Sequence, residues 1–113
     1  MRFFNPTFHE GINITVRRGG KEYVNETEFG NYVYSHESDP IGFMHIEFCW
    51  QMRFVDIENE DIERQHDAQC RNIDGLYNRM TQLYPGFDAR EIVTILAFKF
   101  TPFAENYVFS SLS

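Results

Sequence analysis

The sequence has little cysteine, few positive charges and no long hydrophobic run. Two cysteines in 113 residues cannot make a framework of disulfide bonds, so we expect a reduced chain without a disulfide. Ten Lys and Arg against 17 Asp and Glu leave a net charge of −7, which argues against a protein that coats DNA or RNA by neutralising phosphates. A small nucleotide site or a local basic patch remains compatible with that charge. No run approaches the ~18 apolar residues of a membrane span, so no membrane association is expected.

The amino end lacks the apolar stretch of a secretory signal, because Pro6 and His9 follow only a short apolar patch. We therefore expect a cytoplasmic protein, in the host-cell cytoplasm if the chain is viral. Hydrophobic residues make up 42% and charged residues 24%, which is typical of a globular chain and excludes wholesale disorder. Without a repeat or a long linker, residues 1–113 are expected to form a single domain.

Alternating side chains predict the first strands. Residues 12–17 place three branched apolar side chains on one side and Asn13, Thr15 and Arg17 on the other, which predicts a half-buried strand. A second strand is expected at residues 32–34, after a turn signal at Gly30.

Residues 42–55 give the clearest pattern, a long strand or two strands joined by a bulge. One face is expected in the core. It consists of Met44, Ile46, Phe48, Trp50, Met52 and Phe54. The other face is polar, so it is either solvated or lines a pocket. The regular alternation assigns Trp50 to the core rather than to stacking on a nucleobase.

The spacing then changes to that of a helix. From Asn72, a plausible N-cap, apolar residues recur three and four apart until Pro85 and Gly86 stop the helix. The acidic segment 58–67 is predicted to hold a shorter helix, and residues 92–100 a buried strand. Residues 101–113 form an aromatic C-terminal extension, expected to pack on the domain or on a partner. This order predicts an α+β fold: a small closed or nearly closed sheet with one or two helices at its side.

Five short segments follow one another in a recognisable order. They are T-V-R at Thr15–Arg17, F-G-N-Y-V-Y at Phe29–Tyr34, M-R-F-V-D-I at Met52–Ile57 before the acidic helix, L-Y-P-G at Leu83–Gly86, and the strand at Ile92–Phe100. This ordered set, over roughly residues 8–100, resembles the ASCH family. The resemblance implies a PUA-like β-barrel and a module that binds a nucleotide or a short RNA.

Some small single-domain members of that family hydrolyse the amide of N4-acetylcytidine. They resemble G-x-K-x-x-T-x-R in the first strand, with a Glu on the helix after the central strand. Thr15 and Arg17 match the T-x-R part, but Ile12 stands where the Lys belongs and Glu10 where the glycine belongs.

The family's helix Glu corresponds to Gln65, or to Gln69 with a later gap, while Glu63 is close but out of register. A threonine hydroxyl needs an adjacent base or cation to act as a nucleophile. The missing Lys and Glu therefore favour a protein without catalytic activity. Thr15 and Glu63 are the remaining candidate catalytic residues.

The candidate ligand-binding site lies along the first strand and the basic turn that follows it. Its residues are Asn13, Thr15, Arg17, Arg18 and Lys21. Arginines and backbone N–H groups beside a Gly-Gly turn can hold a phosphate or a carboxylate. The alternative is an ordinary solvated hairpin turn.

Metal binding has one candidate cluster, formed by His45, Glu47 and Cys49 on one strand face. Zinc takes four ligands, and the only other candidate ligands in the sequence are His66 and Cys70. A solvated strand face is the better interpretation, so no metal or other cofactor is expected.

Three functions remain open at this point. The first is an ASCH-like module that binds a nucleotide or short RNA. The second is a small acidic protein, of the kind a virus encodes, that binds and regulates or inhibits a host protein through an acidic, aromatic surface. The third is a degenerate N4-acetylcytidine amidohydrolase. The sequence does not predict an oligomeric state.

Overall fold

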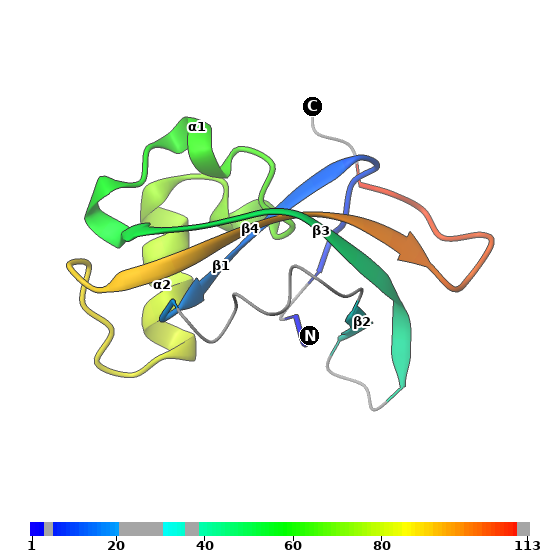
Figure 1. Ribbon diagram of the computed structural model, residues 1–113, viewed down its shortest axis with the longest axis horizontal. Coiled ribbons are helices and arrows are strands. Elements are labelled where there is room, and N and C mark those ends of the chain that lie inside the picture. Colours follow the sequence, from blue (N-terminus) through cyan, green and yellow to red (C-terminus); the bar gives the residue numbers. More distant parts are fainter. Residues whose placement is uncertain (4–5, 21–30, 36–38, 111–113) are drawn as a thin grey trace.

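The computed structural model describes residues 1–3, 6–20, 31–35 and 39–110 (Figure 1). Its elements are β1 (Ile12–Arg18), β2 (Asn31–Tyr34), β3 (Pro40–Arg53), the 3-10 turn η2 (Phe54–Asp56), α1 (Asn59–Ile62), the 3-10 turn η3 (Ala68–Cys70), α2 (Ile73–Leu83) and β4 (Ile92–Pro102). The predicted α+β fold is confirmed, as are the strand at residues 92–100 and the helix that begins after Asn72. Within the described residues, no helix is both long and apolar enough to cross a membrane.

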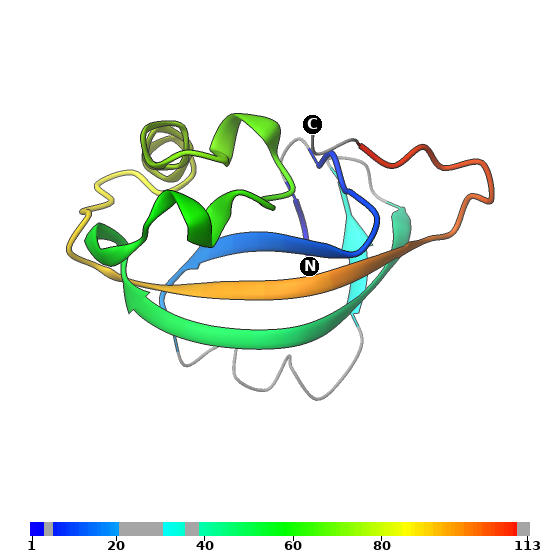
Figure 2. The same ribbon diagram turned by 90° about the horizontal axis from the view of Figure 1, so that it is seen from above.

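The strands form one antiparallel sheet in the order β1-β4-β3-β2. The long strands β3 and β4 are strongly curved, and the helices gather toward one end of the sheet (Figure 2). β4 lies between β1 and β3, and its residues 93–98 are all buried. A central strand covered on both faces reads as an unbroken apolar run, as this one does.

The four strands do not close into a barrel within the described residues, so the predicted PUA-like barrel is not confirmed. Short backbone contacts nevertheless extend both edges of the sheet. At the β2 edge, the Phe3 N–H donates to the Tyr34 carbonyl over 2.8 Å. At the β1 edge, the His66 N–H donates to the Ile14 carbonyl over 3.0 Å, and the His66 carbonyl accepts from the Thr7 N–H. The N-terminal segment is therefore hydrogen-bonded to β2 through Phe3 and to the segment beside β1 through Thr7.

Two hydrophobic clusters occupy opposite faces of β4. The first packs under the helices and contains Ile14, Val16, Phe54, Ile57, Ile62, Cys70, Leu76, Met80, Phe87, Val93, Ile95 and Ala97. The second packs under the N-terminal segment and contains Phe3, Phe8, Val33, Met44, Ile46, Leu96, Phe98 and Phe100. Tyr107 and Phe109 of the C-terminal extension pack against the second cluster, as the aromatic content of this segment predicts.

A bulge in β3 overturns the expectation that Phe48 and Trp50 lie in the core. The pairing with β4 shifts between Ile46 and Phe48, so every later side chain changes face. Ile46 stays buried, but Phe48 is 68% exposed and Trp50 is 36% exposed. The strand therefore presents aromatic side chains to solvent.

The sequence predicts that β1 is buried on one side only. In the structure Asn13 and Thr15 on its polar side are buried as well. The Asn13 amide accepts from the His9 N–H and donates to the His9 carbonyl, both over 2.9 Å. Because the amide satisfies these backbone groups, it can be buried at little cost. The N-terminal segment and residues 64–67 cover this side of the strand.

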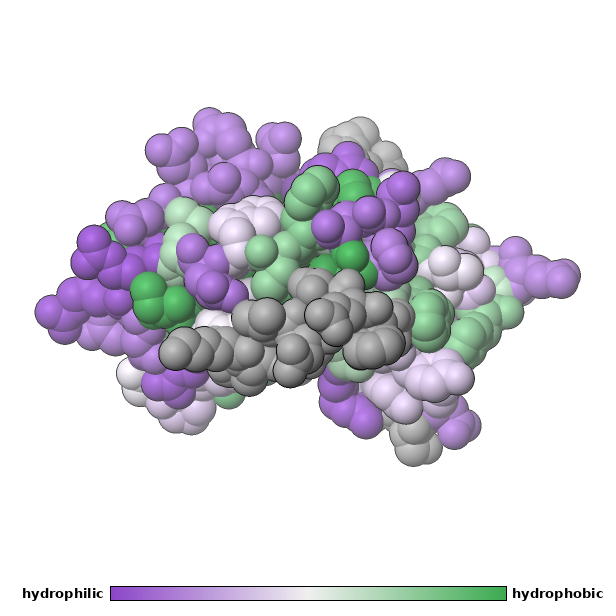
Figure 3. Space-filling view, viewed as in Figure 1, coloured by the Kyte–Doolittle hydropathy of each residue, from purple (hydrophilic) through white to green (hydrophobic). Residues whose placement is uncertain are grey.

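Both helices begin at a capping residue, and the one for α2 is the predicted Asn72. Asn72 caps α2 by accepting the Gly75 N–H over 2.9 Å, and α1, shorter than the acidic segment, has a capping box between Glu58 and Asp61. Gly75 is required by packing, since a Cβ there would lie 1.9 Å from the Gln69 carbonyl oxygen. Hydrophilic residues surround α1, whereas apolar ones are visible over the opposite end of the sheet (Figure 3).

Candidate functional site

A small polar pocket opens where β1, the segment 65–70 and α2 meet. It encloses about 30 Å³, close to the volume of one water molecule. Its polar lining residues are Thr15, Arg17, Gln65, His66, Asp67 and Arg79, and its apolar wall includes Leu76 and Met80 of α2. The enclosed part can admit one protruding atom of a ligand, while the remainder of the ligand would lie at the mouth.

β1 supplies a hydroxyl and a guanidinium to this pocket. A parallel bridge pairs Ile14 with Gln65, so Thr15 and His66 come next in register and point to the same side. Thr15 is only 2% exposed, and its hydroxyl has no hydrogen-bond partner among the described residues. The Arg17 guanidinium carbon lies 4.7 Å from the ring centre of Phe3, which holds the side chain by a cation–π contact.

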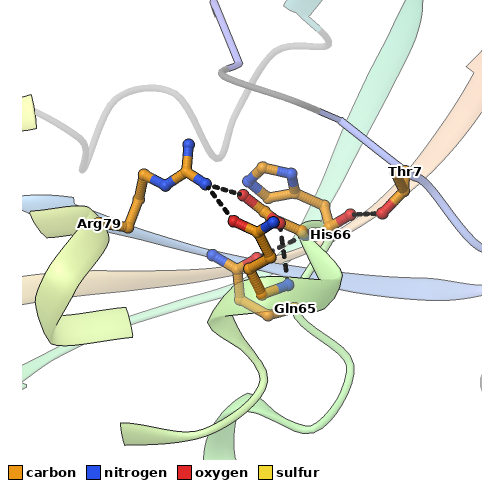
Figure 4. A network of polar contacts seen from close by, with 6 residues as sticks. Thr7, Gln65, His66 and Arg79 are labelled. Carbon is orange, nitrogen blue, oxygen red and sulfur yellow. Dashed lines mark hydrogen bonds and ion pairs between the residues drawn. The ribbon is translucent and has the colours of Figure 1, made fainter. Parts of the chain in front are cut away.

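A network of polar contacts fixes the segment 65–70 (Figure 4). The Gln65 amide oxygen accepts the Asp67 N–H over 2.6 Å, and Asp67 in turn caps η3 by accepting the Gln69 N–H over 3.0 Å. Arg79 of α2 pairs with the other Asp67 oxygen at 3.2 Å and donates to the Gln69 side chain over 3.0 Å. The buried ion pair therefore joins α2 to the segment that runs beside β1.

His66 is buried with an unsatisfied ring nitrogen. The residue is 6% exposed, its ring packs edge-on against Phe3 at 4.8 Å, and its Nδ1 has no partner. Burial, followed by the positive charge of Arg17, holds the pKa of His66 well below its usual 6.5. The imidazole is therefore neutral at pH 7.

Cys70 also lines the pocket but is not a reactive thiol. Burial and the nearby Asp67 carboxylate raise the pKa of Cys70 to about 12, so the thiolate is scarcely populated at neutral pH. Cys70 instead packs in the first hydrophobic cluster. Both cysteines, Cys49 and Cys70, are free thiols.

The predicted site residues divide between this pocket and other places. Thr15 and Arg17 line the pocket, and Gln65, one of the two positions matched to the family's helix Glu, does so as well. Arg18 points elsewhere and pairs with Glu91 at 2.7 Å. Asn13, as described above, clamps the backbone at His9. Lys21 lies outside the described residues, and the exposed Glu63 is not among the pocket residues.

Sequence reasoning missed His66, Asp67 and Arg79 as members of the site. His66 and Asp67 lie in an irregular segment without periodicity, so no pattern identified their direction. The burial of Arg79 could have been predicted, because its position in α2 falls within the apolar stripe, beside Leu76 and Met80. A charged residue in such a stripe needs a buried partner, which here is Asp67.

The three candidate metal ligands on β3, His45, Glu47 and Cys49, do not form a metal centre among the described residues. His45 Nδ1 lies 3.5 Å from Glu47, which also faces Lys99 at 3.8 Å. Within the part of the chain that the structure describes, no group of three or more His, Cys, Asp or Glu side chains could hold a metal ion.

Comparison with known proteins gives no relative: no protein-family model, curated protein or solved structure matches this chain. The function must therefore be argued from the geometry.

Proposed function

We propose that this protein is an ASCH-like module that binds a nucleotide or short RNA at the pocket beside β1. One observation carries the proposal. Thr15, Arg17 and Gln65, three positions singled out by the resemblance to the ASCH family, line the same pocket, although Gln65 lies 50 residues after Thr15 in the sequence. Thr15 and Arg17 share one side of β1 because side chains alternate along a strand, so the informative observation is that Gln65 joins them from another segment.

The charges around the pocket suit an anionic ligand. Arg17 and Arg79 face a single carboxylate, that of Asp67, among the lining residues. Arg71 lies close by, where its Nε donates to the Gln65 carbonyl over 2.9 Å. A chain with a net charge of −7 thus carries a local excess of positive charge at this place. Arginine is well suited to a phosphate, which accepts two parallel hydrogen bonds from its planar group.

A PUA-like barrel is the finer fold that this proposal assumes. Two contacts support it: the N-terminal segment is hydrogen-bonded to the β2 edge at Tyr34 and to the segment beside β1 at His66. A curved sheet whose open edges are both joined to one short segment is close to closure. The second hydrophobic cluster would then be the barrel interior.

On this proposal the protein binds its ligand without catalysing a reaction. In the described residues neither a lysine nor a glutamate lines the pocket, so Thr15 has no strong activating group there. The low pKa of His66 also makes it a weak base. Incubation with N4-acetylcytidine, with detection of cytidine by mass spectrometry and with Thr15→Ala as control, tests for residual hydrolysis. Turnover above that control would show an amidohydrolase instead.

Calorimetric titration with nucleosides, nucleoside 5′-monophosphates and short RNA oligomers tests the binding proposal. Arg17→Ala is expected to weaken binding by about tenfold or more, because a charge-assisted hydrogen bond contributes ~1.5–3 kcal/mol. Arg53→Ala is the matched control, since Arg53 is exposed at the C-terminal end of β3, does not line the pocket and pairs only loosely with Asp56 at 3.6 Å. Equal affinities for the two variants would show that the site is elsewhere.

A second candidate function is binding to another protein, and the exposed aromatic residues favour it. They are Tyr32, Phe43, Phe48, Trp50, Tyr77 and Phe103. Tyr32 packs edge-on against both Phe43 and Phe103, so part of this set forms one exposed cluster. Aromatic residues are enriched at protein interfaces. A pull-down from cell lysate tests this function. We expect the wild type and Arg17→Ala to recover the same stoichiometric protein partner, and Phe48→Ser to lose it.

A further inference from the structure

The pocket wall contains a buried histidine, His66, which has no role in the proposed function as stated so far. His66 Nδ1 has no partner, yet the ring lies in a wall that also carries the Thr15 hydroxyl and the Arg17 guanidinium. Leaving a buried polar atom unsatisfied costs ~1–3 kcal/mol. Such an atom needs an explanation, and a ligand that occupies the pocket supplies one.

Several charged groups face His66 from different elements. They are Arg17 on β1, Arg79 on α2, Arg71 after η3, His9 in the N-terminal segment, and Asp67, which is paired with Arg79. The positive groups outnumber the single carboxylate, and this excess adds to burial, the larger cause, in lowering the pKa of His66 and keeping the imidazole neutral. A bound anion would offset this positive excess and so favour the protonated imidazole.

We propose that the pocket takes a phosphate or sulfate group, one oxygen of which enters beside Thr15 and Arg17, and that His66 binds a proton as the anion enters and becomes a second charged donor. This inference rests on the proposed function and makes it more specific. The ligand is the anionic end of a nucleotide, and an uncharged nucleoside does not suffice.

The enclosed volume agrees with this mode of binding. About 30 Å³ accommodates one oxygen atom but not a nucleobase, so the rest of the ligand stays at the mouth. A tetrahedral anion presents single oxygens in several directions, whereas a base presents a flat edge. Protonation adds a charge-assisted hydrogen bond to those from Arg17, and hydrogen bonds of that type are the stronger ones.

Proton uptake has a measurable consequence. An anion that binds the protonated form more tightly raises the pKa of His66 in the complex, so affinity increases as the pH falls through that raised value. The same anion binds more weakly at high pH, where His66 stays neutral. A neutral nucleoside gives no such dependence.

Nuclear magnetic resonance on the ¹⁵N-histidine-labelled full chain provides the test. The imidazole signal of His66 is followed against pH in sodium sulfate and in sodium chloride of equal ionic strength, because sulfate has no proton that titrates in this range. Sulfate is expected to raise the pKa of His66 by one unit or more, the shift for tenfold tighter binding to the protonated form. His45, which is exposed on β3 and does not line the pocket, serves as the internal control for general effects of the salts.

Cytidine and cytidine 5′-monophosphate distinguish the failure of this inference from the failure of the proposed function. If the monophosphate binds but neither it nor sulfate moves the His66 titration, the proton-linked site is wrong and the binding module stands. If sulfate moves the titration but no nucleotide or RNA binds, the anion site stands and the nucleotide function is wrong. If cytidine binds as tightly as its monophosphate at every pH, anion selection is overturned. His66→Gln is expected to bind the monophosphate with an affinity that no longer rises at low pH.

Discussion

At the scale of single residues, His66 links stability to pH as well as to ligand. Its unfolded-state pKa is near 6.5, whereas burial and Arg17 keep the folded-state value well below that. Between the two values the unfolded chain binds a proton that the folded chain does not. Stability from this group is complete above pH 6.5 and is lost as the pH falls toward the folded-state value.

Acid unfolding measures this contribution. We expect the free energy of unfolding in urea to fall by up to about 1.4 kcal/mol per pH unit below pH 6.5, and His66→Gln to flatten that fall. His9 contributes in the same direction, since burial lowers its pKa too, so the fall is reduced rather than abolished. Gln82→Ala, at an exposed and uncharged position of α2, is the control and is expected to leave the slope as in the wild type. An unchanged slope in His66→Gln would contradict the assignment.

At the scale of elements, the β3 bulge decides which aromatic residues are core and which are surface. Ile46 lies before the shift in pairing and is buried in the second cluster. Phe48 lies after the shift and is exposed. In an unbroken strand the two side chains would share one buried face.

Two alanine variants distinguish the bulged strand from the unbroken one. We expect Ile46→Ala to destabilise the protein by about 2–5 kcal/mol, the range for truncation of a buried side chain. Phe48→Ala is expected to change stability by less than about 1 kcal/mol, because the ring is largely exposed already. The measurement is urea unfolding of both variants. Comparable large losses in both would indicate that the strand has no bulge.

The start of α2 gives a second test at this scale. Replacing a helical glycine by alanine normally stabilises a protein by ~0.5–1 kcal/mol. At Gly75 we expect the opposite, a loss of about 1–3 kcal/mol, since the new methyl group would collide with the Gln69 carbonyl of η3. Gln82→Ala, at an exposed position in the same helix, is the control and should be nearly neutral in thermal unfolding. A Gly75→Ala protein more stable than the wild type would contradict the packing of η3 on α2.

The elements themselves could be predicted where local patterns determine them. Asn72 and Pro85 bracket α2 in the sequence because capping and helix breaking are local effects. The bulge could not be located, because the residue inserted at Glu47 fits an alternating strand and only its pairing with β4 reveals the shift. The burial of Asn13 and Thr15 on the polar side of β1 was missed for a similar reason, since it depends on long-range contacts with the N-terminal segment and the segment 64–67.

At the scale of the whole molecule, the clustered arginines and the exposed aromatic residues suggest two different binding surfaces. The chain is acidic overall, yet the arginines of β1, η3 and α2 gather around one pocket. The aromatic residues exposed by the bulge lie on β3, which β4 separates from β1. Of the candidate site, Thr15 and Arg17 could be predicted because they belong to a strand with a clear pattern. His66, Asp67 and Arg79 required the fold, because a buried ion pair between a loop and a helix leaves no local spacing.

The two surfaces make different predictions for where a ligand binds, and one measurement separates them. Backbone amide shifts of the ¹⁵N-labelled protein, recorded during titration with cytidine 5′-monophosphate, report contacts over the whole chain. We predict that the largest shifts occur at Thr15, Arg17 and His66, while Phe48 and Trp50 do not change. A saturating response centred on Phe48 and Trp50, or no response at millimolar nucleotide, would contradict the assignment of the pocket beside β1 as the binding site.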